Sequence, residues 1–386
     1  MTTRIAFDLS GLAWRYRTGV QNLYWAFVDA WARQSELRDA PDVLFYDRSG
    51  IFNRHVAAAA PGSYAPSAPA WWPDRLRRPL QAAIRLTGAL NPNLQGRINH
   101  VWNWNIFHPT GCRGSITIPD VLPLEFPQWF DAKFRRLTHQ SLRFAAERAE
   151  FVFAISNHVK QRILETTTVA PERVRVVYPG IDSHYFVGID SGLVEPTLRR
   201  HGLTRGRYLL SSGFLDPRKN LARQLQAFLI HVQRNRSDLR YALTGLKTAL
   251  SGELLQLIES PELRDRVVFL GYVPQDELKT LMSQSAALMY CSIAEGFGLP
   301  IIEAMAVGAP VITSATSSMQ EVASSRARLV NPLEPEDIAA AIDETLACSI
   351  EDRDERIKLN QAYAREFTID NWLAGHLHAF ASGATT

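Results

Sequence analysis

The sequence predicts an α/β fold built from two Rossmann-like domains, and three observations lead to this prediction. The chain has 386 residues, and a single hydrophobic core usually stops growing near ~250–300 residues. Short apolar runs that end in glycine or polar loops alternate with segments of helical periodicity. Hydrophobic residues make up 46% of the chain and charged residues 21%, which is typical of a globular protein rather than a disordered one. This alternation predicts parallel sheets that are covered by helices on both faces.

The first half contains a strand, a glycine-containing loop and an amphipathic helix, followed later by a second strand–helix unit. Ser156 is the expected N-cap of the later helix. Strands are predicted at Arg4–Leu9, Phe151–Ile155 and Val174–Tyr178, and helices at Gly19–Arg33 and about 157–165. These elements form the expected first domain, residues 1–187.

The second half repeats the same order of elements. Strands are predicted at Tyr208–Ser212, Tyr241–Thr244, Val267–Leu270, Ala286–Tyr290 and Val311–Thr313, and helices at Leu221–Gln233, Glu277–Gln284 and Pro300–Ala306. The polar, glycine-containing stretch from Val187 to Arg207 is the expected linker. We therefore expect a second domain at 188–366 and a final helical segment, 367–386, that returns to the first domain.

The composition favours a cytoplasmic protein. The three cysteines, Cys112, Cys291 and Cys348, are few and far apart, as expected of reduced thiols. No apolar run approaches the ~18 residues that cross a bilayer, and the first strand follows Arg4 directly, without a signal-peptide pattern. Residues 1–187 carry 22 Lys and Arg against 15 Asp and Glu, which indicates either an anionic partner or ordinary drift in composition.

The most informative motif is Glu-Gly-Phe-Gly-Leu-Pro-Ile-Ile-Glu, from Glu295 to Glu303. A buried strand precedes it, and Pro300 suits the first position of a helix. The glycines let the backbone approach a ligand, and a helix N-terminus favours an anion. The two carboxylates are suited to accept hydrogen bonds from sugar hydroxyls.

This motif resembles the signature of the retaining family 4 glycosyltransferases, which have the GT-B fold of two Rossmann-like domains facing each other across a cleft. The resemblance implies that Glu295 contacts the donor sugar and Glu303 the ribose of the nucleotide. It also places the backbone N–H groups of Phe297, Gly298 and Leu299 against the donor sugar and phosphates.

A second segment, from Ser212 to Asn220, resembles the donor-phosphate segment of the same family. Adjacent cations can neutralise a diphosphate as it leaves. The resemblance implies that Lys219 contacts the diphosphate and that the turn at Gly213 lies against the donor. Family members often carry an arginine at the position of Phe214, so we expect Arg218 to supply that charge.

The first half contains two weaker matches to the family. The segment around Asp120 resembles a stretch in which a histidine precedes the aspartate, but here Pro119 replaces that histidine. Asp120 is therefore expected either to orient the acceptor or to cap a turn. Gly19 matches the family's first glycine-rich loop, although Gln21 replaces the second glycine. In the second half, Val273 matches the loop beside the nucleobase.

Two further segments carry charge. Asp352 and Asp354 have the Asp-x-Asp form of some metal sites, but they lie in a polar helical run, and we interpret them as a solvated face. The basic stretch 71–97, which begins with two tryptophans, is interpreted either as a helix packed on the core or as a peripheral contact with the anionic inner face of the cell membrane. The sequence contains no Walker loop and no His/Cys cluster with metal-ligand spacing.

The resemblance therefore implies a metal-independent, retaining hexosyltransferase of bacterial surface polysaccharide synthesis. The donor is a nucleotide sugar, with GDP-mannose favoured, and the acceptor is a glycan or lipid-linked oligosaccharide; no cofactor and no nucleic acid are expected. Two alternatives stay open: another GT-B activity, such as a synthase or a sugar-nucleotide epimerase, and a catalytically silent subunit that binds nucleotide sugar or glycan. A dinucleotide-dependent oxidoreductase is disfavoured because no Gly-x-Gly-x-x-Gly follows the first strand.

Overall fold

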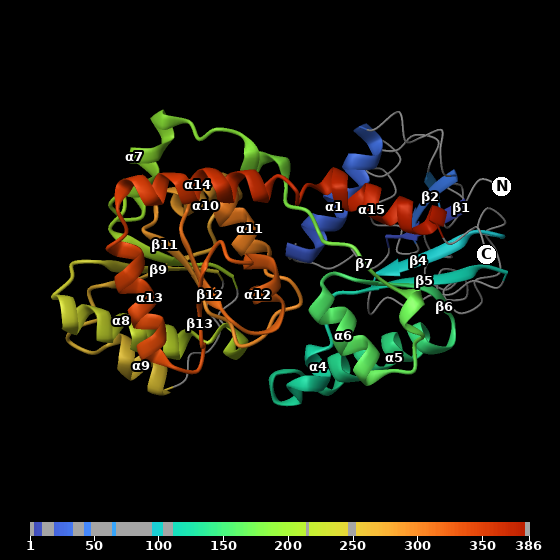
Figure 1. Ribbon diagram of the computed structural model, residues 1–386, viewed down its shortest axis with the longest axis horizontal. Helices are drawn as coiled ribbons and strands as arrows, with labels where there is room; N and C mark the ends of the chain where they lie inside the picture. The colour runs from blue at the N-terminus through green and yellow to red at the C-terminus, as the bar shows by residue number, and fades with distance from the viewer. Residues whose placement is uncertain are drawn as a thin grey trace, which may run out of the picture. The chain divides into compact units, whose positions relative to one another are not determined.

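The chain folds into two compact units in a computed structural model (Figure 1). One unit contains Met1–Asp182 and Thr368–Thr386, and the other contains Ser183–Phe367. The structure describes residues 4–9, 19–33, 42–47, 64–66, 95–102, 111–213, 216–245 and 252–382. The limits expected from the sequence, 1–187 and 188–366 for the two domains and 367–386 for the helical segment that returns to the first, stay a prediction.

The first unit is built on a seven-stranded sheet of order β3-β2-β1-β4-β5-β6-β7. Every strand pair in it is parallel. The strands are β1 (Arg4–Asp8), β2 (Asp42–Asp47), β3 (Tyr64–Pro66), β4 (Ile98–Trp102), β5 (Arg113–Ile118), β6 (Ala149–Ala154) and β7 (Val174–Val176). Parallel pairing requires crossover connections and usually buries both faces of the sheet.

Helices cover both faces of this sheet. They are α1 (Gly19–Arg33), α4 (Leu122–Glu125), α5 (Ala132–Glu147), α6 (Asn157–Thr166) and α15 (Ile369–Ser382), with 3-10 turns η4 (Pro127–Trp129) and η5 (Pro171–Arg173). One hydrophobic cluster joins α1 and α15 to the sheet and includes Phe151 and Phe153 of β6. A second cluster joins α5 and α6 to Val152 and Ala154. Because alternate residues of a strand point to opposite faces, the two clusters lie on opposite sides of the sheet.

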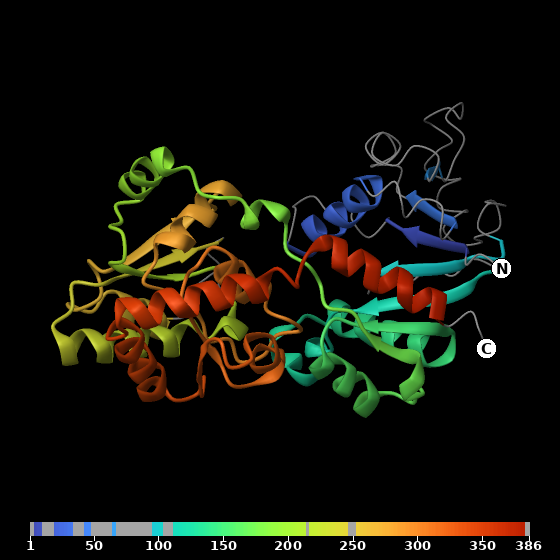
Figure 2. The same cartoon turned by 45° about the horizontal axis from the view of Figure 1, so that its top comes forward.

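The last helix, α15, is part of the core of the first unit. Its residues Trp372, Leu373 and Phe380 are buried in the same cluster as Phe7 and Phe27. Figure 2 shows α15 running beside α1 along this unit. The end of the chain therefore completes a core whose strands come from its beginning.

The backbone makes a close approach to itself where α15 begins. Ile181 forms a parallel bridge with Thr368. A Cβ atom added to the neighbouring Gly180 would lie 2.2 Å from the carbonyl carbon of Thr368. Because Cβ atoms do not approach a backbone so closely, this position requires glycine.

The second unit contains a six-stranded parallel sheet of order β10-β9-β8-β11-β12-β13. Its strands are β8 (Tyr208–Ser211), β9 (Arg240–Thr244), β10 (Val267–Gly271), β11 (Ala287–Tyr290), β12 (Val311–Ser314) and β13 (Arg328–Val330). Two parallel sheets with crossover helices confirm the predicted α/β class.

The helices of the second unit lie between its strands in the chain or flank them. They are α7 (Ser191–Arg200), α8 (Leu221–Asn235), α9 (Gly252–Ile258), α10 (Gln275–Gln284), α11 (Leu299–Ala306), α12 (Ser317–Ala323), α13 (Pro335–Leu346) and α14 (Ile350–Ala364), with 3-10 turns η6 (Ser183–Phe186) and η7 (Pro217–Lys219). In β11, Ala287 and Met289 belong to the cluster that packs α8 and α13 on the sheet. The alternation of side chains therefore points Tyr290, the last residue of β11, to the other face.

The polar stretch that was expected to be the linker is folded. Residues Ser191–Arg200 form α7, which Asp190 caps by accepting a hydrogen bond from the Gly192 N–H at 2.8 Å. Val194 and Leu198 of this helix are buried. These two apolar residues, four positions apart, outweigh the helix-breaking tendency of the proline that lies inside α7.

Candidate functional site

Two connections at the carboxyl edge of the second sheet carry the residues singled out in the sequence. One follows β8 and contains η7, with Arg218 and Lys219 in its last turn. The other follows β11 and runs to α11. Because β8 and β11 are neighbouring parallel strands, both connections emerge at the same edge of the sheet, where ligands of such folds bind.

Glu295 holds both predicted cations at this edge. Its two carboxylate oxygens accept hydrogen bonds from the Arg218 guanidinium at 2.5 Å and the Lys219 ammonium at 2.7 Å. Arg218 also lies 3.4 Å from a carboxylate oxygen of Asp216. The side chain of Glu295 is only 8% exposed, so these are ion pairs in a largely desolvated place, where electrostatic interactions are strong.

Burial and charge act in opposite directions on the ionisation of this cluster. Burial raises the pKa of Glu295, but the charges of Lys219 and Arg218 outweigh burial and hold that pKa below its usual value. Burial lowers the pKa of Lys219, although Glu295 opposes the change. The carboxylate therefore stays ionised and keeps the two cations fixed in the ligand-free protein.

Tyr290 completes the cluster and was missed as a site residue in the sequence. Its hydroxyl accepts a hydrogen bond from Lys219 at 2.8 Å, and the Lys219 nitrogen lies 4.3 Å from the centre of its ring. Burial raises the pKa of Tyr290, and the charges of Glu295 and Glu303 act in the same direction. The only signal in the sequence was its place at the end of a buried strand.

The connection that carries Glu295 is fixed by two serines at the start of α12. Ser317 accepts a hydrogen bond from the Glu295 N–H at 2.9 Å and donates one to the Glu295 carbonyl at 2.7 Å. Ser318 donates to the carbonyls of Glu295 and Phe297 at 2.8 and 2.9 Å. These bonds satisfy backbone groups that a buried loop would otherwise leave unpaired. Neither serine was expected as a site residue.

The opposite connection is fixed by Asn220. This residue has a left-handed backbone, with φ of 58°, directly after Lys219. Its side-chain amide donates to the carbonyls of Cys291 at 3.1 Å and Pro332 at 2.6 Å. The N–H of residue 293 also donates to the Arg218 carbonyl at 2.9 Å. The two connections are therefore bonded to each other, which holds the cations beside the carboxylate.

The glycine-rich turn leads directly into α11. Gly298 has φ of 109°, a conformation that favours glycine, and forms the N-cap position of this helix. Phe297 is buried, Leu299 is half-buried at the first helical position, and Glu303 is half-buried in the second turn. The backbone N–H groups at the N-terminus of α11 thus lie in the connection that carries Glu295. The N-terminus of such a short helix does not by itself identify a ligand.

The remaining predicted donor-side residues lie at the same edge. Gly213 follows β8, and a Cβ atom placed on it would lie 3.5 Å from Cε of Lys219. Val273 follows β10 and is buried, whereas its neighbour Tyr272 is 78% exposed. Phe214 lies outside the described residues.

The predicted acceptor-side residues belong to the first unit. Asp120 follows β5, and its carboxylate accepts a hydrogen bond from the Leu122 N–H at 3.1 Å at the start of α4, so it caps this turn. Gly19 is the first residue of α1. His108 and Asn105, which precede Asp120 in the sequence, could serve either the structure or the site by their residue types, and both lie outside the described residues.

The basic stretch 71–97 lies outside the described residues except for its last three. Among these, Arg97 is buried rather than exposed: its guanidinium pairs with the Asp42 carboxylate at 2.9 Å and donates to the Asp42 carbonyl at 2.7 Å. Arg97 therefore supports the first sheet and cannot contribute to a basic outer face. No described helix combines the length and apolarity needed to span a membrane.

The second charged segment forms part of a helix. Asp352 and Asp354 are exposed on α14, as expected of a solvated face. Asp352 accepts a hydrogen bond from the Ser349 hydroxyl at 2.8 Å. Within the described ranges, no three His, Cys, Asp or Glu side chains gather in a way that could hold a metal ion.

Comparison with solved structures defines the fold first. HepE of Anabaena, solved in complex with UDP and glucose, superposes with a TM-score of 0.70 at 18% sequence identity, covering 98% of this chain and 100% of that one. WaaG, a glycosyltransferase involved in lipopolysaccharide biosynthesis, gives a TM-score of 0.68 at 15% identity over 97% of this chain and 98% of its own. The fold is therefore that of the GT-B glycosyltransferases, as expected from the sequence.

Sequence comparison then defines the family. Residues 18–185 match the model of Glycosyltransferase Family 4, and residues 197–363 match that of Glycosyl transferases group 1. The O-antigen chain mannosyltransferase RfbU of Salmonella typhimurium is 30% identical over 269 residues, which cover 67% of this chain and 69% of that protein. The O-antigen chain mannosyltransferase B of Escherichia coli is 26% identical over 69% of this chain and 70% of its own length. The chain belongs to the family 4 glycosyltransferases.

Proposed function

We propose that this glycosyltransferase moves a hexose or deoxyhexose, with retention of configuration, from a nucleotide-sugar donor to a glycan or lipid-linked oligosaccharide in bacterial surface polysaccharide synthesis. The buried cluster of Glu295, Lys219 and Arg218 at the carboxyl edge of the second sheet carries the proposal. The names of the O-antigen mannosyltransferases to which the chain is similar favour mannose as the sugar, and GDP-mannose is the donor that we propose from the family resemblance.

The two cations of the cluster are suited to bind the donor diphosphate. Lys219 and Arg218 are adjacent and half-buried, and Glu295 and Asn220 already orient them. Charges that are fixed before the reaction stabilise a leaving group without the cost of reorganisation. In this proposal they neutralise the charge that develops on the diphosphate, and no metal ion is needed.

Glu295 has a second task in this proposal. In the ligand-free protein it neutralises Lys219 and Arg218, so a diphosphate that approaches them takes over part of that pairing. The carboxylate then becomes available to accept hydrogen bonds from the hydroxyls of the donor sugar. Glu303 lies near enough to Tyr290 for its charge to act on that hydroxyl and is proposed to bind the ribose.

The proposed chemistry breaks one bond and forms one. The bond between the anomeric carbon and the diphosphate oxygen breaks, and its electron pair leaves with the diphosphate. The acceptor hydroxyl attacks the same face of the anomeric carbon, and its proton passes to the departing diphosphate oxygen. The backbone of Phe297, Gly298 and Leu299 would position the sugar and phosphates, with Gly213 and Val273 beside the donor.

The acceptor side is assigned to the first unit. Gly19 and Asp120 are proposed to line it, with Asp120 acting through a carboxylate oxygen while it caps the turn before α4. The protein is proposed to work in the cytoplasm. Peripheral contact with an anionic membrane through residues 71–96 stays part of the proposal, without Arg97.

A transfer assay tests the proposal. The chain is incubated with GDP-mannose, UDP-glucose or dTDP-rhamnose and with lipid-linked oligosaccharides extracted from polysaccharide-producing bacteria, with and without EDTA. Mass spectrometry measures the glycolipid product, and NMR gives its anomeric configuration. We expect one donor to give a product that retains the donor's configuration, unchanged by EDTA.

Variants separate this activity from a silent binding subunit. Glu295→Ala should abolish most transfer, while Lys358→Gln, at an exposed lysine on α14, should leave it unchanged. Binding of a nucleotide sugar without turnover for any donor and acceptor would favour the silent subunit. An inverted product would exclude the retaining mechanism.

A further inference from the structure

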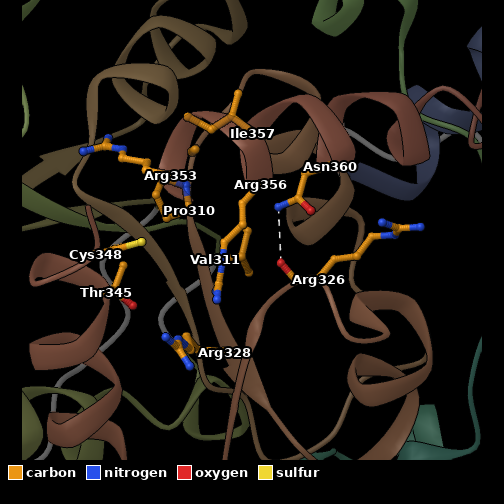
Figure 3. A pocket seen from close by; sticks show the side chains of 11 residues that line it. Pro310, Val311, Arg326, Arg328, Thr345, Cys348, Arg353, Arg356, Ile357 and Asn360 are labelled. Atoms are coloured by element: carbon orange, nitrogen blue, oxygen red, sulfur yellow. Dashed lines mark hydrogen bonds between the residues drawn. The ribbon is translucent and has the colours of Figure 1, made fainter. Parts of the chain in front are cut away.

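A second candidate site lies at the opposite edge of the second sheet. A pocket opens where β12 and β13 begin, between the end of α13 and one side of α14 (Figure 3). Pro310 and Val311 at the start of β12 line it, whereas Glu295 follows the carboxyl end of β11. The pocket is therefore separate from the proposed donor site, and its occupant does not depend on the proposed function.

Four arginines line this pocket, and no carboxylate does. They are Arg326, Arg328, Arg353 and Arg356. Arg328 pairs with Glu344 at 3.0 Å, in an ion pair whose two side chains are 37% and 57% exposed, so this pairing neutralises it only weakly. Among the described residues, the other three guanidinium groups form no ion pair.

The fold defines the position of one of these arginines, Arg326, by direct contacts. The guanidinium of Arg326 stacks over the ring of Tyr363 at 4.5 Å, and its backbone carbonyl accepts a hydrogen bond from Asn360 at 3.2 Å. The buried Nε of Arg326 has no hydrogen-bond partner within the described parts of the chain. Figure 3 shows the Arg356 side chain extending from α14 toward Arg328. The guanidinium groups of Arg326 and Arg353 point away from this pair in Figure 3, so Arg328 and Arg356 are the two positive groups that approach each other in a lining without a carboxylate.

We propose that this pocket binds the phosphate group of an anionic ligand. A guanidinium offers several N–H donors in a planar fork that matches two oxygens of a phosphate. Arg356 and Arg328 face the proposed phosphate from two elements, and the Thr345 hydroxyl in the lining adds a donor. The phosphate belongs either to a soluble metabolite or to a lipid headgroup, because both present the same chemistry to the arginines.

Cys348 gives a local readout of occupancy, because it lines the pocket and is a half-buried free thiol. The full chain is treated with iodoacetamide at increasing concentrations of inorganic pyrophosphate, and mass spectrometry follows alkylation of each cysteine separately. We expect pyrophosphate to slow alkylation of Cys348. Cys112, a half-buried cysteine of the first unit, is the internal control and should react at an unchanged rate. Binding at the donor site, which Cys348 does not line, gives no such protection.

Two matched variants on α14 test the role of the arginines. Both residues are exposed, but Arg356→Gln removes a charge that lines the pocket, whereas Lys358→Gln removes a charge outside it. We expect Arg356→Gln to raise the half-protecting pyrophosphate concentration about tenfold, as expected for a lost charge-assisted hydrogen bond. Lys358→Gln should change it less than about twofold, as an exposed charge outside the site should. No protection of Cys348, or equal protection in both variants, would overturn the proposal.

A vesicle arm distinguishes the two sources of phosphate. Sedimentation with phosphatidylcholine vesicles that contain phosphatidic acid is compared with sedimentation with pure phosphatidylcholine. One outcome is stronger binding to the anionic vesicles, which Arg356→Gln abolishes and Lys358→Gln leaves intact. This outcome supports the pocket and assigns a lipid headgroup as its ligand. Protection by pyrophosphate without such vesicle binding supports the pocket and assigns a soluble ligand.

Discussion

Replacing Glu295 by glutamine should weaken the ligand-free protein and increase its response to nucleotide. The change keeps the shape of the side chain but removes the charge that pairs with Lys219 at 2.7 Å and with Arg218. Removing one partner of a buried pair costs about 3–5 kcal/mol. We take the lower end, about 3 kcal/mol, because Lys219 keeps the Tyr290 hydroxyl as a partner.

This energy corresponds to a measurable shift in melting temperature. For a domain of 150–250 residues, 1 kcal/mol shifts Tm by roughly 2–4 °C, so unit Ser183–Phe367 should melt about 6–12 °C lower. A nucleoside diphosphate then supplies the missing anion. The shift in Tm that it produces should be larger in Glu295→Gln than in the wild type, in which the diphosphate competes with Glu295. Transfer should nevertheless fall on the order of 10²-fold, because the proposed contact to the sugar is lost.

Differential scanning fluorimetry with and without GDP, UDP and dTDP measures both effects. Glu355→Gln on α14 is the control, because this carboxylate is exposed, and such changes usually stay within about 0.5 kcal/mol. A Glu295→Gln variant that melts with the control would refute the expected cost of breaking the buried pair. A smaller rise in Tm in the variant than in the wild type, with the nucleotide that binds the wild type, would refute the expected competition.

Two further predictions concern the first unit. Burial lowers the pKa of His376 from 6.5 to about 4. Since the unfolded chain binds the proton more readily, keeping His376 neutral should cost little stability above about pH 6.5 and about 2 kcal/mol at pH 5, and the buried His100, whose pKa burial also lowers, adds to the loss. Urea unfolding at pH 6.5 and pH 5 should show this loss of unfolding free energy in the wild type and in the control His378→Gln, at an exposed residue of the same helix. The loss should be smaller in His376→Gln. An equal loss in all three proteins would contradict the prediction. Gly180→Ala should destabilise the protein by more than about 3 kcal/mol, because its Cβ would lie 2.2 Å from the Thr368 backbone. The control in the same urea assay is Gly188→Ala, where a Cβ meets nothing within 4 Å and which should unfold like the wild type. A similarly mild effect of Gly180→Ala would show that the segments around Gly180 and Thr368 separate easily.

Much of the fold was predictable because its signals are local. The strand before Glu295 is a short apolar run, and the helix after it begins at Leu299, one residue before the predicted Pro300. The α7 helix was not predicted, because its proline and glycine resemble a linker while its stability comes from the burial of Val194 and Leu198. Tertiary packing therefore decided a stretch in which local signals pointed the wrong way.

The candidate site was predictable in its residue types but not in its pairing. The sequence placed Lys219 and Glu295 each in the loop after a predicted strand, and the structure makes those strands neighbours and joins the two residues by an ion pair. Nothing local in the sequence indicated that Tyr290, Ser317 and Ser318 complete the arrangement, because these contacts join positions far apart in the chain.

The basic stretch 71–97 is an example in which the charge pattern did not predict the environment of a residue. The arginines of the stretch suggested a basic outer face, whereas Arg97 is buried by its contact with Asp42, a residue far away in the sequence. The charge of this segment can be read from the sequence, but the buried environment of Arg97, its last residue, could not be predicted from it.

Binding of a donor diphosphate at Lys219, beside Glu295, is central to the proposed function. Isothermal titration calorimetry of GDP, UDP and dTDP with the wild type, Lys219→Gln and Lys358→Gln tests this contact most directly. We predict that one nucleotide binds to the wild type and to Lys358→Gln with similar affinity, and at least about tenfold more weakly to Lys219→Gln. Equal affinity in all three proteins, or no binding of any of these nucleotides, would contradict the proposed donor site.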